Sequence, residues 1–166
     1  MNRVDSVNWE QFWNIIAESR HGFDSRRLQA SQRNQVTQLK RLLDALPADE
    51  QADFGRRYTE LFYKAYRYDL WAALYVIIGG GGDDSFMDFR EWLISMGRDV
   101  YHSALNDPDS LAFIEEAEDC IFEGFGNVIP HHEPATPRPA HPTGEEWEDE
   151  DLPRLLPKLW AKYVDR

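Results

Sequence analysis

Cysteine is nearly absent from this chain of 166 residues, which has a single thiol at Cys120. One thiol cannot form an internal disulfide or a zinc site built from several cysteines. The acidic neighbours Glu118, Asp119 and Glu123 are expected to raise the pKa of the thiol and so to weaken it as a nucleophile. We therefore expect Cys120 to be a buried structural residue, and we expect the protein to work in a reducing compartment, the cytoplasm.

Long apolar segments are absent as well. The most apolar run, Leu70 to Ile78, has about half of the ~18 residues that a membrane-spanning helix requires. The first residues, MNRVDSVNWEQFW, lack the apolar stretch of a secretory signal peptide. The sequence therefore predicts neither a membrane segment nor an export signal.

Basic residues are scarce in the second half of the chain. Residues 1–68 contain 11 Lys and Arg against 9 Asp and Glu, a net charge of +2. Residues 69–166 contain 7 against 21, a net charge of −14, which brings the total to −12. Such an acidic half repels phosphates, so we expect no nucleic-acid binding, whereas a basic protein partner or a cation would be attracted.

Large apolar side chains are plentiful, with six tryptophans, and a chain of this length can bury one hydrophobic core. They recur at helical spacing from the start of the chain. Asn8 and Gln11 have the pattern of a capping box, which predicts that a helix begins at this point. The apolar face of that helix is expected to present Trp9, Phe12, Trp13 and Ile16.

The same spacing predicts further helices near residues 25–46, 48–65, 69–78, 86–96 and 100–104. The pattern leaves open whether 48–78 is one helix or two, and a buried strand at 74–78 competes with a helix. The segment after residue 68 is apolar on all sides, which indicates a central, fully buried helix. The turn NDPDS is expected to start another helix at Asp109 or Ser110, and a further helix is predicted over residues 114–124.

The composition changes after residue 128. Residues 130–144, PHHEPATPRPAHPTG, hold five prolines and are expected to be extended and mobile, and the acidic run EEWEDED follows. We predict an all-α protein with a single compact domain of about six to eight helices and a proline-rich, acidic C-terminal arm. Its parts are a helical domain over 1–128, a linker over 129–151, and a tail over 152–166. The tail is expected to form a helix near Pro157 and to dock on the domain.

The stretch IIGGGGDDSF places four glycines and two aspartates after the most apolar run. It lacks the Lys-Ser or Lys-Thr of a P-loop and the strand–turn–helix setting of a dinucleotide-binding loop. The first interpretation is structural: Asp83 and Asp84 cap the next helix and pair with Arg90 or Arg98. The second is functional: Asp69, Asp83, Asp84 and Arg90 form a polar site that could hold a divalent cation.

Histidines are few, and most of them are poorly placed for metal binding. His131, His132, Glu133 and His141 are metal-ligand types, but they lack the i, i+4 spacing of a helical zinc site. They lie in the proline-rich stretch, where a fixed geometry is entropically costly. We therefore expect neither a metal nor another cofactor at these residues.

Three stretches carry a specific combination of motifs: FWNII, then AYRYDLWAALYVIIGGGGDDSFMDFREWLISMGRDVYHSALNDPDSL, then AEDCIFEGF. Over residues 9–125 they resemble the bacterial domain-of-unknown-function family 4240. The chain has Gly81-Gly82 where the family pattern has a cysteine and a small residue, so no thiol role carries over to this loop. The resemblance implies a small bacterial protein, in some cases associated with regulatory modules, and no established activity. By motif match it directs attention to Asp69, Asp83, Asp84, Arg90 and Asp109.

Two functions are compatible with these patterns. The first is a cytoplasmic, non-catalytic interaction or regulatory domain that binds a protein partner through its acidic half or a groove near Asp83. The second is a divalent-metal-dependent enzyme or ligand binder that uses the carboxylates after the central helix. The second function requires Asp83 and Asp84 to converge with a third ligand on a concave site.

Overall fold

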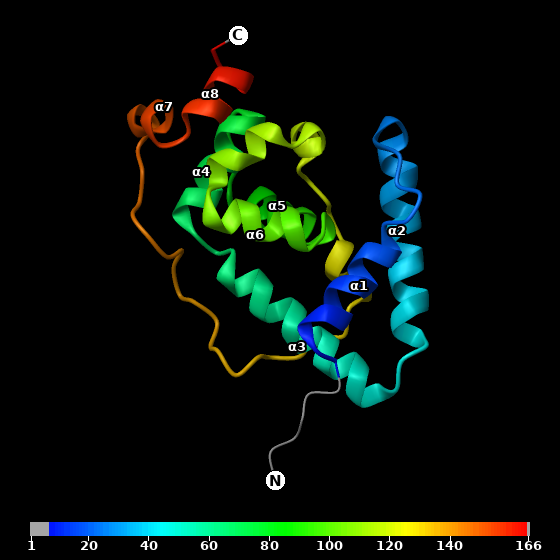
Figure 1. Cartoon of the computed structure of the whole chain (residues 1–166). Helices are drawn as coiled ribbons and strands as arrows, with labels where there is room; N and C mark the ends of the chain where they lie inside the picture. Colours follow the sequence, from blue (N-terminus) through cyan, green and yellow to red (C-terminus); the bar gives the residue numbers. More distant parts are fainter. Residues whose placement is uncertain (1–6, 166) are drawn as a thin grey trace.

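Helices form the regular elements of the computed structural model, which describes residues 7–165 (Figure 1). The α-helices are α1 (Trp9–Ser19), α2 (Leu28–Asp44), α3 (Ala48–Lys64), α4 (Tyr68–Ile78), α5 (Asp83–Ser95), α6 (Arg98–Asn106), α7 (Leu152–Leu155) and α8 (Pro157–Tyr163). Short 3-10 helices lie between them: η1 (Ser25–Arg27), η2 (Pro108–Phe113), η3 (Glu115–Asp119), η4 (Phe125–Val128) and η5 (Asp149–Asp151). The all-α prediction is confirmed, and none of the helices within residues 7–165 is long and apolar enough to cross a membrane.

The first helix begins as its capping pattern predicts. The Asn8 side chain accepts a hydrogen bond from the Gln11 backbone N–H at 2.8 Å, and the Gln11 side chain accepts one from the Asn8 N–H at 2.9 Å. Phe12, Trp13 and Ile16 are buried, and α1 packs against α2 and α3. The capping box therefore sets where the chain enters the core.

Residues 48–78 form two helices. The chain leaves α3 after Lys64 and passes through Arg67 in an extended conformation before α4 starts. The extended Arg67 forms an isolated parallel bridge with Thr143, in which Tyr68 N–H donates to the Thr143 carbonyl at 3.0 Å. The competing strand at 74–78 is wrong, because these residues belong to α4.

The helix α4 is central but not buried on every side. Leu70, Ala73 and Leu74 have no exposed surface, whereas Ile78 is 41% exposed at the C-terminal end. The helix ends at Gly79, whose φ of 75° lies in the left-handed region, and Gly80 and Gly81 also have positive φ. The glycines are thus required by a tight reversal of the chain between α4 and α5.

The segment after α6 departs from the predicted helices. The NDPDS turn leads into the 3-10 helix η2, which begins at Pro108, and not into an α-helix beginning at Asp109 or Ser110. Asp107 caps η2, because its side chain accepts a hydrogen bond from the Asp109 N–H. Residues 114–124 form η3 and turns instead of an α-helix. Four acids lie within η3 without a basic residue, and their repulsion at helical spacing disfavours an α-helix.

Cys120 anchors the chain that follows η3. It has no exposed surface, and burial raises the pKa of its thiol to about 12. Phe122 and Phe125 are also buried, and Phe122 N–H donates to the Asp88 carbonyl of α5 at 3.2 Å. The burial of these side chains holds residues 120–125 against the neighbouring helices, although this segment does not itself form an α-helix.

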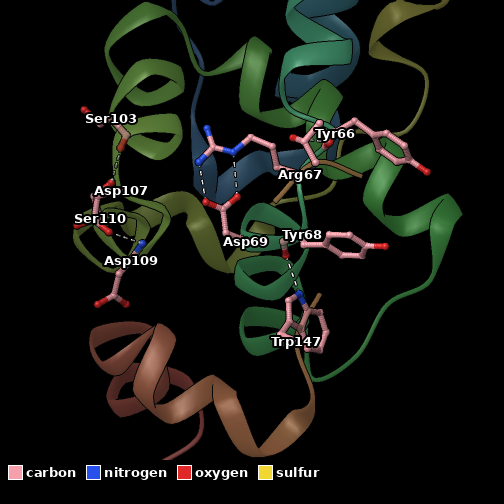
Figure 2. Close-up of polar contacts among 10 residues, drawn as sticks. Tyr66, Arg67, Tyr68, Asp69, Ser103, Asp107, Asp109, Ser110 and Trp147 are labelled. Atoms are coloured by element: carbon pink, nitrogen blue, oxygen red, sulfur yellow. Dashed lines mark hydrogen bonds and ion pairs between the residues drawn. The ribbon is translucent and has the colours of Figure 1, made fainter. Parts of the chain in front are cut away.

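Asp109 connects the middle of the chain to its C-terminal helices. The residue is 6% exposed, and its carboxylate accepts hydrogen bonds from the backbone N–H groups of Lys158 at 3.1 Å and Leu159 at 2.8 Å. Figure 2 shows the side chain directed toward these helices. Asp109 therefore supplies acceptors for the first free N–H groups of α8, although it lies far from α8 in the sequence, and its charge complements the positive end of the helix dipole. The helix α8 also packs against α4 and η2.

The proline-rich arm, residues 129–151, runs along one side of the molecule from α3 to α7 (Figure 1). At α3, the Pro130 carbonyl lies against Gly55, and the Tyr63 hydroxyl donates to Glu133 at 2.8 Å. Near α4, the Trp147 indole N–H donates to the Tyr68 carbonyl at 2.7 Å, as Figure 2 shows. The arm therefore contacts the helices at both ends of its extended course.

Replacing Asp109 by Ala leaves two largely buried N–H groups of α8 without their acceptor. We expect the free energy of unfolding to fall by about 1–3 kcal/mol in chemical denaturation. Asp99→Ala is the control, because the Asp99 side chain is 95% exposed. Equal stabilities of the two variants would contradict the capping role of Asp109.

Gly55→Ala tests the contact between α3 and the arm. In an open helix this change stabilises by about 1 kcal/mol. Here the added Cβ would overlap with the Pro130 carbonyl oxygen, so we expect lower stability and faster amide exchange in the arm. Gly82→Ala is the control, because Gly82 has a negative φ of −93° and open space around it. A stabilised Gly55→Ala protein would show that the arm is not held at this point.

Candidate functional site

A groove of about 610 Å³ lies between α3, α5 and residues 126–139. On α3 and just beyond it, Tyr58, Phe62 and Tyr66 line the groove at a spacing of four residues, one face of the helix. The groove residues contributed by α5 are Asp83, Asp84, Met87, Arg90 and Glu91. The third wall is formed by the η4 region and the arm, including His131, Glu133 and Arg138.

Arg90 lies at the inner end of this groove and is 7% exposed. Its Nε donates to the Phe86 carbonyl at 3.3 Å, and its Nη1 donates to the Phe62 carbonyl at 3.2 Å. The guanidinium carbon is 3.9 Å from the centre of the Phe62 ring, with Tyr66 and Phe86 at 4.7 and 4.8 Å. Burial lowers the pKa of Arg90 to about 10, so the side chain remains cationic at neutral pH.

Asp83 and Asp84 are the first two residues of α5, and both are exposed at the mouth of the groove. The N-cap residue is Gly82, and no side chain caps the helix, so the predicted cap is wrong. Among residues 7–165 neither aspartate forms an ion pair, with Arg90, Arg98 or any other residue. Their charges still favour the helix through its dipole, and they leave the carboxylates available to a ligand.

The five residues that the sequence motifs singled out lie in different parts of the structure. Asp83, Asp84 and Arg90 line the groove. Asp69 instead pairs with Arg67 through two hydrogen bonds of 3.0 and 2.6 Å, and Figure 2 shows the two side chains facing each other. Asp109 contacts α8, so two of the five residues serve the packing around α4 rather than the groove.

Glu91 is a groove residue that the sequence motifs did not identify. Its Oε1 accepts a hydrogen bond from the Gly126 N–H at 2.9 Å and one from the Tyr58 hydroxyl at 3.5 Å. Burial raises the pKa of Glu91, and burial also raises the pKa of Tyr58 well above its usual value. The helical spacing of Asp83, Met87 and Glu91 is the signal that could have placed Glu91 at this site.

The arm supplies a second carboxylate that is already engaged. Glu133 accepts from the Tyr63 hydroxyl at 2.8 Å and lies 3.0 Å from His131 Nε2. The hydrogen bond from Tyr63 is the main cause that lowers the pKa of Glu133, and His131 and Arg138 act in the same direction. Glu133 is therefore a charged, hydrogen-bonded group that fixes the arm against α3.

The groove residues suit ligand binding better than proton transfer. Glu91 and Glu133 each accept two contacts from the protein, and the Arg90 cation is held by carbonyls and aromatic rings. Over residues 7–165 no group of three or more His, Cys, Asp or Glu is arranged to hold a metal ion. The described residues thus do not supply the third ligand that a metal site at Asp83 and Asp84 requires.

Glu91→Ala removes the acceptor of the Gly126 N–H, and we expect the free energy of unfolding to fall by about 1–3 kcal/mol. Glu91→Gln keeps an acceptor and removes a charge that burial disfavours, so at neutral pH we expect it to equal or exceed the wild type in stability. The raised pKa means that the folded protein binds a proton at higher pH than the unfolded chain. The advantage of Gln is therefore present above the raised pKa and shrinks as the pH falls through it.

Chemical denaturation at neutral and acidic pH measures both changes. If Glu91→Gln lost as much stability as Glu91→Ala at neutral pH, the Glu91 charge rather than its acceptor would hold the η4 region.

Comparison with known proteins places the chain in a family. No curated protein and no solved structure matches the chain. A family model described as "Protein of unknown function (DUF4240)" matches residues 8–131, well over half of the chain. The matched range contains α1 to α6 and two walls of the groove, whereas Arg138 and the C-terminal helices follow it. The resemblance found in the sequence motifs is thus confirmed, and the chain belongs to the DUF4240 family.

Proposed function

We propose that this protein is a non-catalytic interaction domain that binds a basic segment of a protein partner along α5 and in the adjoining groove. The observation that carries the proposal is the acidic, exposed edge of α5 beside a groove with aromatic walls. The acidic edge consists of Asp83, Asp84 and Asp88, with Met87 between them. It attracts cations and repels nucleic acid.

The acidic edge contains charges that repel one another. Burial is the main cause that raises the pKa of Asp88, and the carboxylates of Glu123 and Asp84 raise it further. Asp83 and Asp84 have no ion-pair partner among residues 7–165. Lysine or arginine side chains of a partner would relieve this repulsion, which is electrostatic complementarity of the kind that orients protein partners.

Apolar contacts complement the charges. Met87 is 44% exposed on the acidic edge and also lines the groove. Behind it lie the rings of Tyr58, Phe62 and Tyr63 from α3. A cavity of about 610 Å³ with such walls accepts one or two large side chains. A segment that alternates basic and apolar residues matches both the edge and the groove.

The proposal assigns a binding role because the two glutamates of the groove are already held by the protein. Glu91 is held by Gly126 and Tyr58, and Glu133 is held by Tyr63 and His131. The proposed place of action is the cytoplasm, where a reduced thiol such as Cys120 persists.

A short peptide of alternating lysine and leucine is the probe for this function. Isothermal titration calorimetry should detect binding that weakens with added salt. The triple substitution Asp83→Asn, Asp84→Asn and Asp88→Asn should raise the dissociation constant by about tenfold, because three partly exposed charge contacts are lost.

The matched control removes the same charge elsewhere, with Glu145→Gln, Glu146→Gln and Glu150→Gln, all exposed in the acidic run. We expect this control to bind almost as the wild type does. Equal weakening of the two triple variants would mean that the peptide responds only to net charge, and it would refute binding at the acidic edge.

A further inference from the structure

Two arginines, Arg90 and Arg138, line the same groove. Arg90 is more than nine-tenths buried, and among residues 7–165 its Nη2 takes part in no hydrogen bond, whereas Nε and Nη1 are both used. Arg138 enters the groove from the arm and is exposed. Neither arginine forms an ion pair with a described residue. Among the described residues the two positive charges are therefore not neutralised by a direct ion pair.

The two guanidinium groups are close enough to affect each other. Burial is the largest cause that lowers the pKa of Arg90, and the charge of Arg138 adds to it. The charge of Asp83 raises the pKa of Arg90, and the charge of Arg138 contributes to lowering the pKa of Glu133. These acids moderate the positive field of the arginines, but among residues 7–165 none of them forms an ion pair with Arg90 or Arg138.

The charges around this space favour a carboxylate over a phosphate. Asp83, Asp84 and Glu133 surround the groove with negative charge, and a doubly charged phosphate would be repelled more strongly than a singly charged carboxylate. A planar guanidinium matches the two oxygens of a carboxylate in bidentate geometry. The acids of the mouth in turn match a cationic group carried next to that carboxylate.

We propose that Arg90 and Arg138 form an anion subsite that binds the free C-terminal carboxylate of the partner segment, while basic residues just before the end of that segment contact Asp83 and Asp84. The inference rests on the proposed function and names the part of the partner that enters the groove. The carboxylate of a chain end needs no further residues to fit in the groove, whereas a chain with an internal Asp or Glu has to continue past the arginines.

The test compares two lysine–leucine peptides that differ only at the C-terminus, one with a free acid and one with an amide. The acid should bind about tenfold more tightly in calorimetry, because a charge-assisted contact to the arginines is lost in the amide. Arg138→Gln should remove most of this difference and leave the affinity of the amide nearly unchanged. Arg33→Gln is the control, because Arg33 is an exposed arginine on α2.

Arg90→Lys is a second variant that keeps the buried charge and removes the planar fork. It should also reduce the preference for the acid, and its circular dichroism and melting temperature report whether the fold is retained. A third peptide, with an amide end and one internal Glu, distinguishes a chain end from a side-chain carboxylate. Acetate and inorganic phosphate are added as competitors of the acid peptide, and acetate should be the stronger one.

Each outcome decides between the proposals. Equal binding of acid and amide, with loss of binding in the acidic-edge triple variant, would overturn the carboxylate subsite and leave the proposed function standing. No binding of any peptide would overturn both. Stronger competition by phosphate would overturn the choice of a carboxylate, and tight binding of the internal-Glu peptide would overturn the chain end as its source.

Discussion

The burial of the Arg90 guanidinium is the interaction on which the arrangement of α3 and α5 depends. Its hydrogen bonds reach the Phe86 carbonyl of its own helix and the Phe62 carbonyl near the end of α3. Aromatic rings cover the cation, and Phe86 in turn stacks on Trp71 of α4 at 4.8 Å between ring centres. A cation held in this way costs less to desolvate than an unpartnered one, because carbonyl dipoles and ring faces replace part of its hydration.

Contacts with α3 and with the start of α4 explain how a proline-rich segment can form a wall of the groove. Contacts at Gly55 and Tyr63 hold the start of the arm on α3, and Thr143 and Trp147 hold its end beside the start of α4. Prolines between these points restrict the backbone, so fewer contacts are needed to keep the segment extended. The arm thus brings Arg138 to the groove, although no helix or strand carries it there.

Local patterns predicted the helices well, and failed where distant contacts decide the structure. The capping box at Asn8 was predictable because both of its partners lie within three residues. The course of residues 114–124, which form η3 and turns, was not predictable, because apolar periodicity takes no account of the repulsion between acids or of the burial of Cys120. The role of Asp109 was hidden for a similar reason: its partners lie 49 and 50 residues further along the chain.

Asp69, Asp83 and Asp84 were candidates for a polar site in the sequence, and the family resemblance added Asp109; their surroundings now separate the four. The Asp69 carboxylate already accepts two hydrogen bonds from the Arg67 guanidinium. The Asp109 carboxylate already accepts two from backbone N–H groups of α8, so neither aspartate is free to bind a ligand. Asp83 and Asp84 keep that freedom, because neither forms an ion pair among residues 7–165 and neither caps α5, whose N-cap is Gly82. The glycine-rich loop reverses the chain and places two exposed carboxylates at the mouth of the groove, where the proposed binding would use them.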